Sequence, residues 1–246
     1  MATLYLNEDL HPDAFAVGAR LPVWGADARH AAQVARVRTG ERIGVGDGRG
    51  RIGWGPVVHV AQQEVAIEVA ELAVDPARRP RLILVQALAK GDRDELAVQA
   101  ATELGVDVIV PWQAARSVSR WDAKAEKGLA RWRTIVREAA KQAHRAWVPE
   151  VEGVARLADL VARARTANVF VLEPSAVERL TAVASDPLDD RDVVLVVGPE
   201  GGIAPEELDA LRTAGARLVR LGDTVLRTST AGAAAISVLS ASTGRW

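Results

Sequence analysis

The chain has 246 residues, 49% of them hydrophobic, which is enough for a buried core, and no cysteine. Its net charge of −1 excludes RNA binding through overall positive charge, so any RNA must contact a local basic patch. The absent cysteines exclude disulfides, thiolate zinc sites and cysteine nucleophiles. No apolar run approaches the ~20 residues needed to span a bilayer. The N-terminus also lacks the pattern of a signal peptide, so we expect a cytoplasmic protein with no membrane partner.

Residues 1–74 contain short apolar segments separated by turn residues, which is typical of a small β-barrel. Asp47-Gly48 is a strong hairpin signal. The alternating glycines between 44 and 50 fit that hairpin better than a cofactor loop, because no helix follows them. We expect strands at 54–60 and 65–72 and a short helix at 30–37. The proline-containing segment 74–80 reads as a linker.

After this linker, strand and helix patterns alternate, which predicts a parallel sheet covered on both faces. Asp92 and Glu95 form a candidate capping box at a helix start. Pro205 opens a later helix and Gly215 ends it. The expected strands are 81–88, 106–110, 168–172, 193–197 and 217–221, and the other expected helices are 122–145 and 230–240.

A glycine-rich turn, Gly198–Gly202, follows the apolar strand 193–197, and a second turn follows Leu221-Gly222. Loops at the carboxyl ends of neighbouring strands are where α/β domains build small-molecule pockets. A tight turn without a ligand explains Gly198–Gly202 equally well from physics alone. The motif is neither the dinucleotide fingerprint nor a P-loop, which argues against a dinucleotide oxidoreductase and a P-loop nucleotidase.

Basic residues recur at helical spacing within 122–145, beginning with Lys124, Lys127 and Arg131. Such a face can follow a phosphate backbone, although a solvated face is the commoner explanation. The four histidines show no metal-ligand spacing and the carboxylates do not cluster, so we predict no metal.

Together, the segments 197–202 and 221–228 resemble the ribosomal RNA small subunit methyltransferase E family, which belongs to the SPOUT superfamily of knotted methyltransferases. The likeness covers nearly the whole chain. Segments 29–38 and 47–48 look like the family's N-terminal PUA-like barrel. Its central signatures are matched by 102–106, 116–117 and 138–142.

The resemblance implies an α/β fold with two domains. A PUA-like, RNA-binding β-barrel would occupy 1–74, and a SPOUT methyltransferase domain with a parallel sheet would occupy 75–246. The C-terminal segment 224–246 would thread through the loop around Gly198 to form a deep trefoil knot. The family also implies a homodimer with the pocket at the subunit interface. The implied reaction is methylation of N3 of a uridine in 16S rRNA of the small ribosomal subunit, with S-adenosyl-L-methionine as donor.

Carried over by motif, the cofactor-binding residues are Leu172, Glu173, Gly198, Pro199, Glu200, Gly201, Gly202, Leu221, Gly222, Val225, Leu226, Thr228 and Ser229. Many members carry an acidic residue where this chain has Ser229. The catalytic candidates are Arg227, to stabilise charge on the uracil, and Glu138, as the base. The candidate RNA-binding residues are Arg29, Arg36, Arg38, Arg116 and Arg145. The alternatives are a SPOUT ribose 2′-O-methyltransferase and a non-catalytic, RNA-binding ribosome assembly factor.

Overall fold

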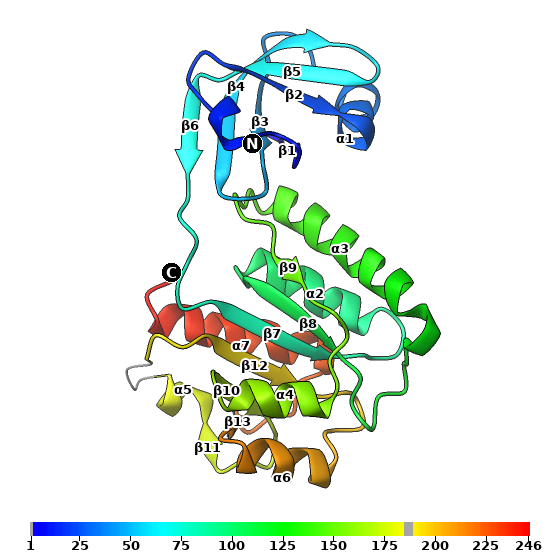
Figure 1. The fold of residues 1–246 in the computed structure, drawn as a ribbon, viewed down its shortest axis with the longest axis vertical. Helices are drawn as coiled ribbons and strands as arrows, with labels where there is room; N and C mark the ends of the chain where they lie inside the picture. The colour runs from blue at the N-terminus through cyan, green and yellow to red at the C-terminus, as the bar shows by residue number, and fades with distance from the viewer. Residues whose placement is uncertain (1, 185–188) are drawn as a thin grey trace. The chain divides into compact units, whose positions relative to one another are not determined.

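The computed structural model describes residues 2–184 and 189–246, which form two compact units (Figure 1). The first unit consists of the residues up to Ala77 together with Ala140–Val148. The second consists of Arg78–Ala139 and Pro149–Trp246. Within the described part of the chain, no helix combines the length and apolar character required to cross a bilayer.

The first unit is built on a six-stranded, mostly antiparallel sheet. Its core is formed by side chains such as Leu21, Val45 and Ile67. The long fourth strand pairs with β5 along one half and with β6 along the other, so the single strand expected at 65–72 is wrong and two strands are present. The strands are β1 (Leu4–Leu6), β2 (Arg20–Trp24), β3 (Arg42–Gly46), β4 (Arg51–Val60), β5 (Glu64–Glu68) and β6 (Glu71–Val74).

The predicted hairpin at Asp47-Gly48 is confirmed between β3 and β4. The Asp47 carboxylate accepts hydrogen bonds from the backbone N–H groups of Arg49 (2.7 Å) and Arg51 (3.0 Å). Gly48 has a φ of +67°, a conformation that glycine adopts without strain. The turn is therefore fixed by its own residues.

The helix expected at 30–37 begins earlier, as α1 (Gly25–Arg29), and continues as a π-helical turn, η2 (His30–Val34). Asp27 explains the early start, because its buried carboxylate accepts the N–H of Leu6 at 3.2 Å. That contact spans 21 residues and has no local signal. The two short 3₁₀ turns among the described residues are η1 (Pro12–Ala14) and η3 (Asp122–Lys124).

Residues 140–148 join the first unit through polar contacts with distant segments. The Lys141 ammonium donates to Asp27 Oδ1 at 2.7 Å, and both side chains are buried. The Trp147 indole N–H donates to the Asp75 carbonyl at 2.8 Å. Val148 donates its N–H to the carbonyl of Gly48, which closes the segment against the hairpin.

The second unit contains a seven-stranded sheet in the order β11-β13-β10-β12-β7-β8-β9, and every pair in it is parallel. The predicted parallel sheet is thus confirmed. The central strands β7 and β12 are buried along their whole length, and their sequences are apolar except for Gln86. The strands are β7 (Leu82–Ala87), β8 (Val108–Trp112), β9 (Glu150–Val151), β10 (Asn168–Leu172), β11 (Glu178–Arg179), β12 (Val193–Val197) and β13 (Arg217–Arg220).

Helices cover both faces of this sheet (Figure 1). The second, fifth and seventh helices pack on one face, while the fourth and sixth pack on the other. The helices are α2 (Arg93–Glu103), α3 (Ala125–Gln142), α4 (Leu157–Ala164), α5 (Leu180–Val183), α6 (Pro205–Thr213) and α7 (Thr228–Ser242). The expected start at Pro205 is confirmed, and Gly215 follows the end of that helix with a φ of +107°.

The capping box expected at Asp92 and Glu95 is wrong. Asp92 occupies the N-cap position of α2, but its side chain makes no capping hydrogen bond. The buried Asp94 carboxylate instead accepts the N–H groups of Ala89 (3.2 Å) and Glu95 (2.9 Å). The long basic helix also ends at Gln142, before the predicted Arg145.

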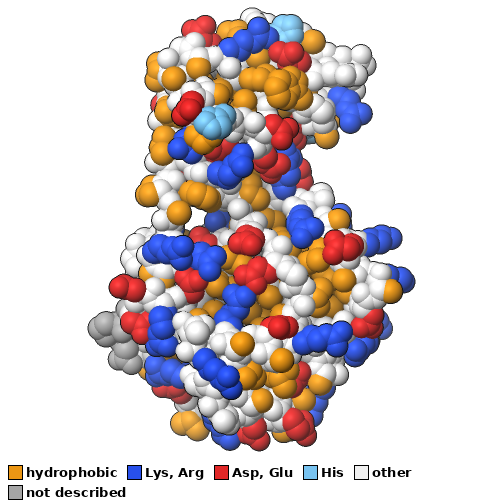
Figure 2. Space-filling model, in the orientation of Figure 1, with side chains coloured by type: hydrophobic (Ala, Val, Ile, Leu, Met, Phe, Trp, Pro, Cys, Tyr) orange, Lys and Arg blue, Asp and Glu red, His pale blue; other side chains and the backbone are white. Residues whose placement is uncertain are grey.

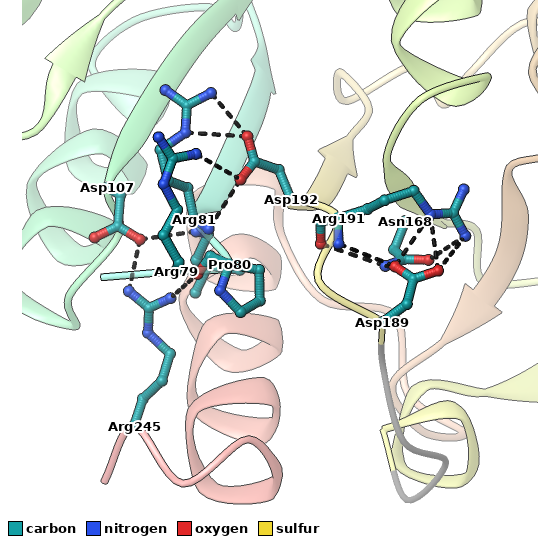
Figure 3. A network of polar contacts seen from close by, with 10 residues as sticks. Arg79, Pro80, Arg81, Asp107, Asn168, Asp189, Arg191, Asp192 and Arg245 are labelled. Carbon is teal, nitrogen blue, oxygen red and sulfur yellow. Dashed lines mark hydrogen bonds and ion pairs between the residues drawn. The ribbon is translucent and has the colours of Figure 1, made fainter. Parts of the chain in front are cut away.

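The amino-terminal edge of the parallel sheet carries a network of charged side chains (Figure 3). Arg81 binds Asp192 through its backbone N–H and its guanidinium, at 2.7–3.0 Å. Arg245, near the end of the chain, donates to Asp107 Oδ2 at 2.6 Å and to the Pro80 carbonyl at 3.1 Å. Because Asp107 also accepts the N–H of Leu82, these bonds fasten the chain end to the starts of β7 and β8.

Candidate active site

A cavity of about 410 Å³ lies at the carboxyl-terminal edge of the parallel sheet, within the second unit. The strands β10, β12 and β13 are in register, with Leu172 opposite both Val197 and Val219, so their following loops start at the same edge. These loops and the residues that lead into α7 line the cavity. This is where open parallel sheets bind ligands.

The first loop, Gly198–Gly202, needs its glycines for packing and for backbone conformation. A Cβ on Gly198 would lie 2.6 Å from the Ile203 side chain. Gly202 has a φ of +73° with no atom within 4 Å of its Cβ position. The loop therefore turns tightly after β12 and exposes backbone beside the cavity.

Glu200 in this loop is held by the start of α2. Its Oε1 accepts the N–H of Lys90 at 3.0 Å and the guanidinium of Arg93 at 3.1 Å. Burial acts to raise the pKa of Glu200, but hydrogen bonds from the backbone and from Arg93 outweigh it and lower the pKa below its usual value. Glu200 is accordingly an ionised anchor for the glycine loop.

The two predicted motifs are joined by hydrogen bonds through Gln86, a fully buried amide in the apolar strand β7. Its Nε2 donates to Thr228 Oγ1 at 2.9 Å, and Thr228 Oγ1 donates to the Gly198 carbonyl at 2.9 Å. The first residue of α7 is thereby fixed to the end of β12. No sequence pattern indicated Gln86, because its partner lies 142 residues away.

The arginines Arg220 and Arg227 border the cavity. Arg227 occupies the N-cap of α7 and is exposed, and its guanidinium forms no ion pair with the residues that the structure describes. Arg220 Nη1 donates to Asp223 at 3.1 Å, while its buried Nε has no hydrogen-bond partner among the described residues. A ligand that carries or develops negative charge would be stabilised here.

The structure brings most of the predicted cofactor-binding residues together. All of them line the cavity except Gly201 and Ser229, and Arg227 lines it as well. Gly201 lies in the same loop, where its carbonyl accepts the Arg116 guanidinium at 3.3 Å, and Ser229 is half-buried in α7. Binding by these residues stays a prediction. The lining residues that the sequence analysis missed are Arg93, Pro174, Val197, Ile203, Val219, Arg220, Thr224 and Ala231.

The other candidates lie outside this cavity. Glu138 is exposed on α3, where Arg137 donates to it at 3.4 Å, and it does not line the cavity. Its role as a base stays a prediction.

The candidate RNA-binding residues Arg29, Arg36, Arg38 and Arg116 are exposed, and Arg145 is half-buried in the first unit. Over the described residues, no group of three or more histidines and carboxylates is arranged to hold a metal.

Comparisons with known proteins give the family. Residues 77–240 match the model of the RNA methyltransferase domain, and residues 25–55 match that of the RNA methyltransferase PUA domain. The chain is 45% identical to the ribosomal RNA small subunit methyltransferase E of Mycobacterium bovis over 100% of this chain and 94% of the relative. It is 31% identical to the Bacillus subtilis protein of the same name, over 89% of this chain and 88% of that protein.

Solved structures of related proteins support the same family assignment. A Neisseria gonorrhoeae ribosomal RNA small subunit methyltransferase E bound to S-adenosyl methionine superposes with a TM-score of 0.84 at 26% identity, covering 98% of both chains. A Legionella pneumophila putative methyltransferase in complex with the same cofactor gives a TM-score of 0.84 at 28% identity, again over 98% of both chains. The predicted α/β fold, with its parallel sheet and N-terminal PUA-like domain, is confirmed. The chain belongs to the ribosomal RNA small subunit methyltransferase E family.

Proposed function

We propose that this protein transfers a methyl group from S-adenosylmethionine to N3 of a uridine in the 16S rRNA of the small ribosomal subunit. The observation that carries the proposal is the cavity formed by the two motif loops, which Gln86 and Thr228 join by hydrogen bonds, in a chain of this family. The curated relatives are named as methyltransferases of small-subunit rRNA, and two solved neighbours hold the cofactor.

The residues present fit that cofactor. About 410 Å³ lies within the range of small-molecule sites, and the walls combine apolar side chains such as Leu172 and Ile203 with a few polar groups. The glycines of the first loop let a ligand approach the backbone closely. The predicted cofactor-binding residues that line the cavity would hold it, namely Leu172, Glu173, Gly198, Pro199, Glu200, Gly202, Leu221, Gly222, Val225, Leu226 and Thr228.

When bound, S-adenosylmethionine supplies an electrophilic methyl group on a sulfonium. Transfer forms the N3–CH₃ bond and breaks the S–CH₃ bond, and the N3 proton must leave to a base. Loss of that proton places negative charge on the uracil ring and its carbonyl oxygens, and the Arg227 guanidinium stabilises it. Glu138 is our candidate base. Holding the two reactants in line supplies much of the remaining acceleration.

We extend the proposal to the assembly. The protein acts as a cytoplasmic homodimer without a metal, and the first unit is an RNA-binding domain over the segment predicted at 1–74. Val225 (76% exposed) and Leu226 (37% exposed) lie beside the cavity and supply apolar surface for a second subunit. We also propose the trefoil knot in the second domain; the hydrogen bond of Thr228 to the Gly198 carbonyl, which holds the start of α7 at the Gly198 loop, supports it.

The test is mass spectrometry of digested rRNA from a strain that lacks this protein, with and without its restoration. We expect one uridine to lose and regain a methyl on N3. A methyl on the ribose 2′ oxygen instead would make the protein a ribose methyltransferase. If calorimetry detects no binding of S-adenosylmethionine and no methyl changes, the protein is an RNA-binding assembly factor.

A further inference from the structure

A second cavity, of about 280 Å³, lies in the second unit between the start of α2, the loop 113–121 and the first half of α3. We refer to it as the tryptophan groove, because Trp121 and Trp132 both line it. Nothing in the site described above uses this groove.

The groove and the cofactor cavity share two chain segments. Lys90 and Arg93 hold Glu200 of the cofactor cavity, while Gly91 and Asp94 in the same segment line the groove. The loop that binds Gly201 through Arg116 continues into the groove at residues 119–121. The segments that line the groove are therefore bonded directly to the Gly198–Gly202 loop of the proposed methyl-transfer site.

Trp121 is held firmly at the wall of the groove. Its backbone N–H donates to Gln113 Oε1 at 3.1 Å. Its ring packs edge-on against the buried Trp132, with centroids 5.1 Å apart. Gly128 of α3 leaves room for it, since a Cβ there would lie 2.5 Å from the Trp121 ring. Trp121 itself is half-buried and so offers an ordered aromatic surface.

The charge at the groove is positive on balance. Arg131 pairs with Glu95 at 2.8 Å, and the buried Asp94 carboxylate accepts hydrogen bonds from two backbone N–H groups. Lys124 and Lys127 are exposed and pair with no carboxylate among the described residues. Figure 2 shows Lys and Arg side chains gathered over α3 at the right of the view.

We propose that the tryptophan groove binds a single-stranded segment of the RNA substrate, with one base stacked on Trp121 and the adjoining phosphates bound by Lys124 and Lys127. An ordered aromatic ring beside free cations is the arrangement that binds single-stranded nucleic acid. A uridine whose N3 is to be methylated must leave its base pair, which leaves its neighbours unstacked and available. The identity of the RNA rests on the proposed function.

The test measures equilibrium binding of the full-length protein to small ribosomal subunits and to a single-stranded RNA oligonucleotide, at several salt concentrations. Lys124→Ala with Lys127→Ala should weaken binding and reduce the slope of log K against log salt by roughly 0.7 for each lost phosphate contact. Trp121→Ala should weaken binding about tenfold without changing that slope, because stacking releases no counterions. Trp121→Phe should retain most of the affinity.

The matched control is Arg133→Ala, which removes an exposed cation from the same helix outside the groove. We expect it to leave RNA binding unchanged, and every variant should bind S-adenosylmethionine like the parent. The proposal that the groove binds RNA would be overturned if the double lysine variant kept the RNA affinity of the parent, or if Arg133→Ala lost as much RNA affinity as that variant. This binding assay does not depend on methyl transfer, so it tests the groove independently of the proposed reaction. Failure of the proposed reaction would be seen instead as absence of methylation by the parent protein.

Discussion

The two edges of the parallel sheet in the second unit are built in opposite ways. At the carboxyl edge, loops rich in glycine surround a cavity, and Arg227 has no ionic partner among the described residues. At the amino edge, arginines and aspartates close the surface by pairing with one another (Figure 3). The same strands supply both edges. We infer that the carboxyl edge is organised for binding and chemistry, as the proposed function requires, while the amino edge stabilises the fold.

The largest effect is expected when positive charge is removed at the carboxyl edge of the sheet. Arg227→Ala should lower the rate of methyl transfer to small subunits by roughly 10²–10³-fold, the usual cost of losing one group that stabilises a developing anion. Circular dichroism and the unfolding midpoint should be unchanged, because Arg227 is exposed. Arg227→Lys is the companion variant, with partial activity expected. Full activity in the alanine variant would remove Arg227 from the mechanism.

The matching experiment at the other edge is Arg245→Ala. The variant loses the bonds to Asp107 and to the Pro80 carbonyl. We expect about 2 kcal/mol less stability in urea unfolding, somewhat below the cost of breaking a fully buried pair. The rate per folded molecule should stay near that of the parent. Arg191→Ala serves as control, since its pair with Asp189 is solvent-exposed and contributes little to stability. A large loss of activity without a loss of stability would contradict the division between the edges.

Thr228→Val probes the connection between the two motif loops. It removes the hydroxyl between Gln86 and Gly198, so the Gly198 carbonyl loses its donor and the Gln86 amide keeps only its bond to the Ala87 carbonyl. We predict about tenfold weaker S-adenosylmethionine binding by calorimetry, equivalent to about 1.4 kcal/mol. Thr228→Ser keeps the hydroxyl and should bind like the parent. Equal affinities of the valine and serine variants would show that the hydroxyl does not position these loops.

The smallest expected effect is the pH dependence of the Arg81–Asp192 pair. Burial acts to raise the pKa of Asp192, but the hydrogen bonds from Arg81 outweigh it and keep the pKa below its ordinary value of 3.8. Its contribution to stability is therefore complete above that ordinary value and is lost as the pH falls through the lower, folded-state value. Asp192→Asn should cost about 1 kcal/mol at pH 7, and the difference from the parent should shrink in acid. A difference that grows as the pH falls would contradict this assignment.

Much of the fold could be predicted because its signals are local. The strands β10 and β12 lie at the residues that their apolar runs indicated, and Asp47-Gly48 makes the expected hairpin with its own side chain. The predicted lining of the cavity could be identified because both motifs are contiguous and end neighbouring strands.

What the sequence could not show depends on contacts between distant segments. Gln86 reads as one more residue of a buried strand until Thr228 is placed beside it. Arg93 lines the cavity because Glu200, 107 residues later, binds it. The failed capping box at Asp92 has the same origin, since the strand-to-helix turn is held by Asp94 and the Ala89 N–H instead.

The buried pair of Lys141 with Asp27 has a consequence for how the protein is made and divided. The first unit takes residues 140–148 from the middle of the chain, so a fragment ending at Ala77 would lack the Lys141 ammonium that pairs with Asp27. During synthesis, this unit cannot be completed until the chain has grown past Val148 and well into the other unit. We therefore expect that the first unit cannot be isolated or fused to another protein by cutting the chain at the linker alone. A fusion protein must include both residues 1–77 and residues 140–148.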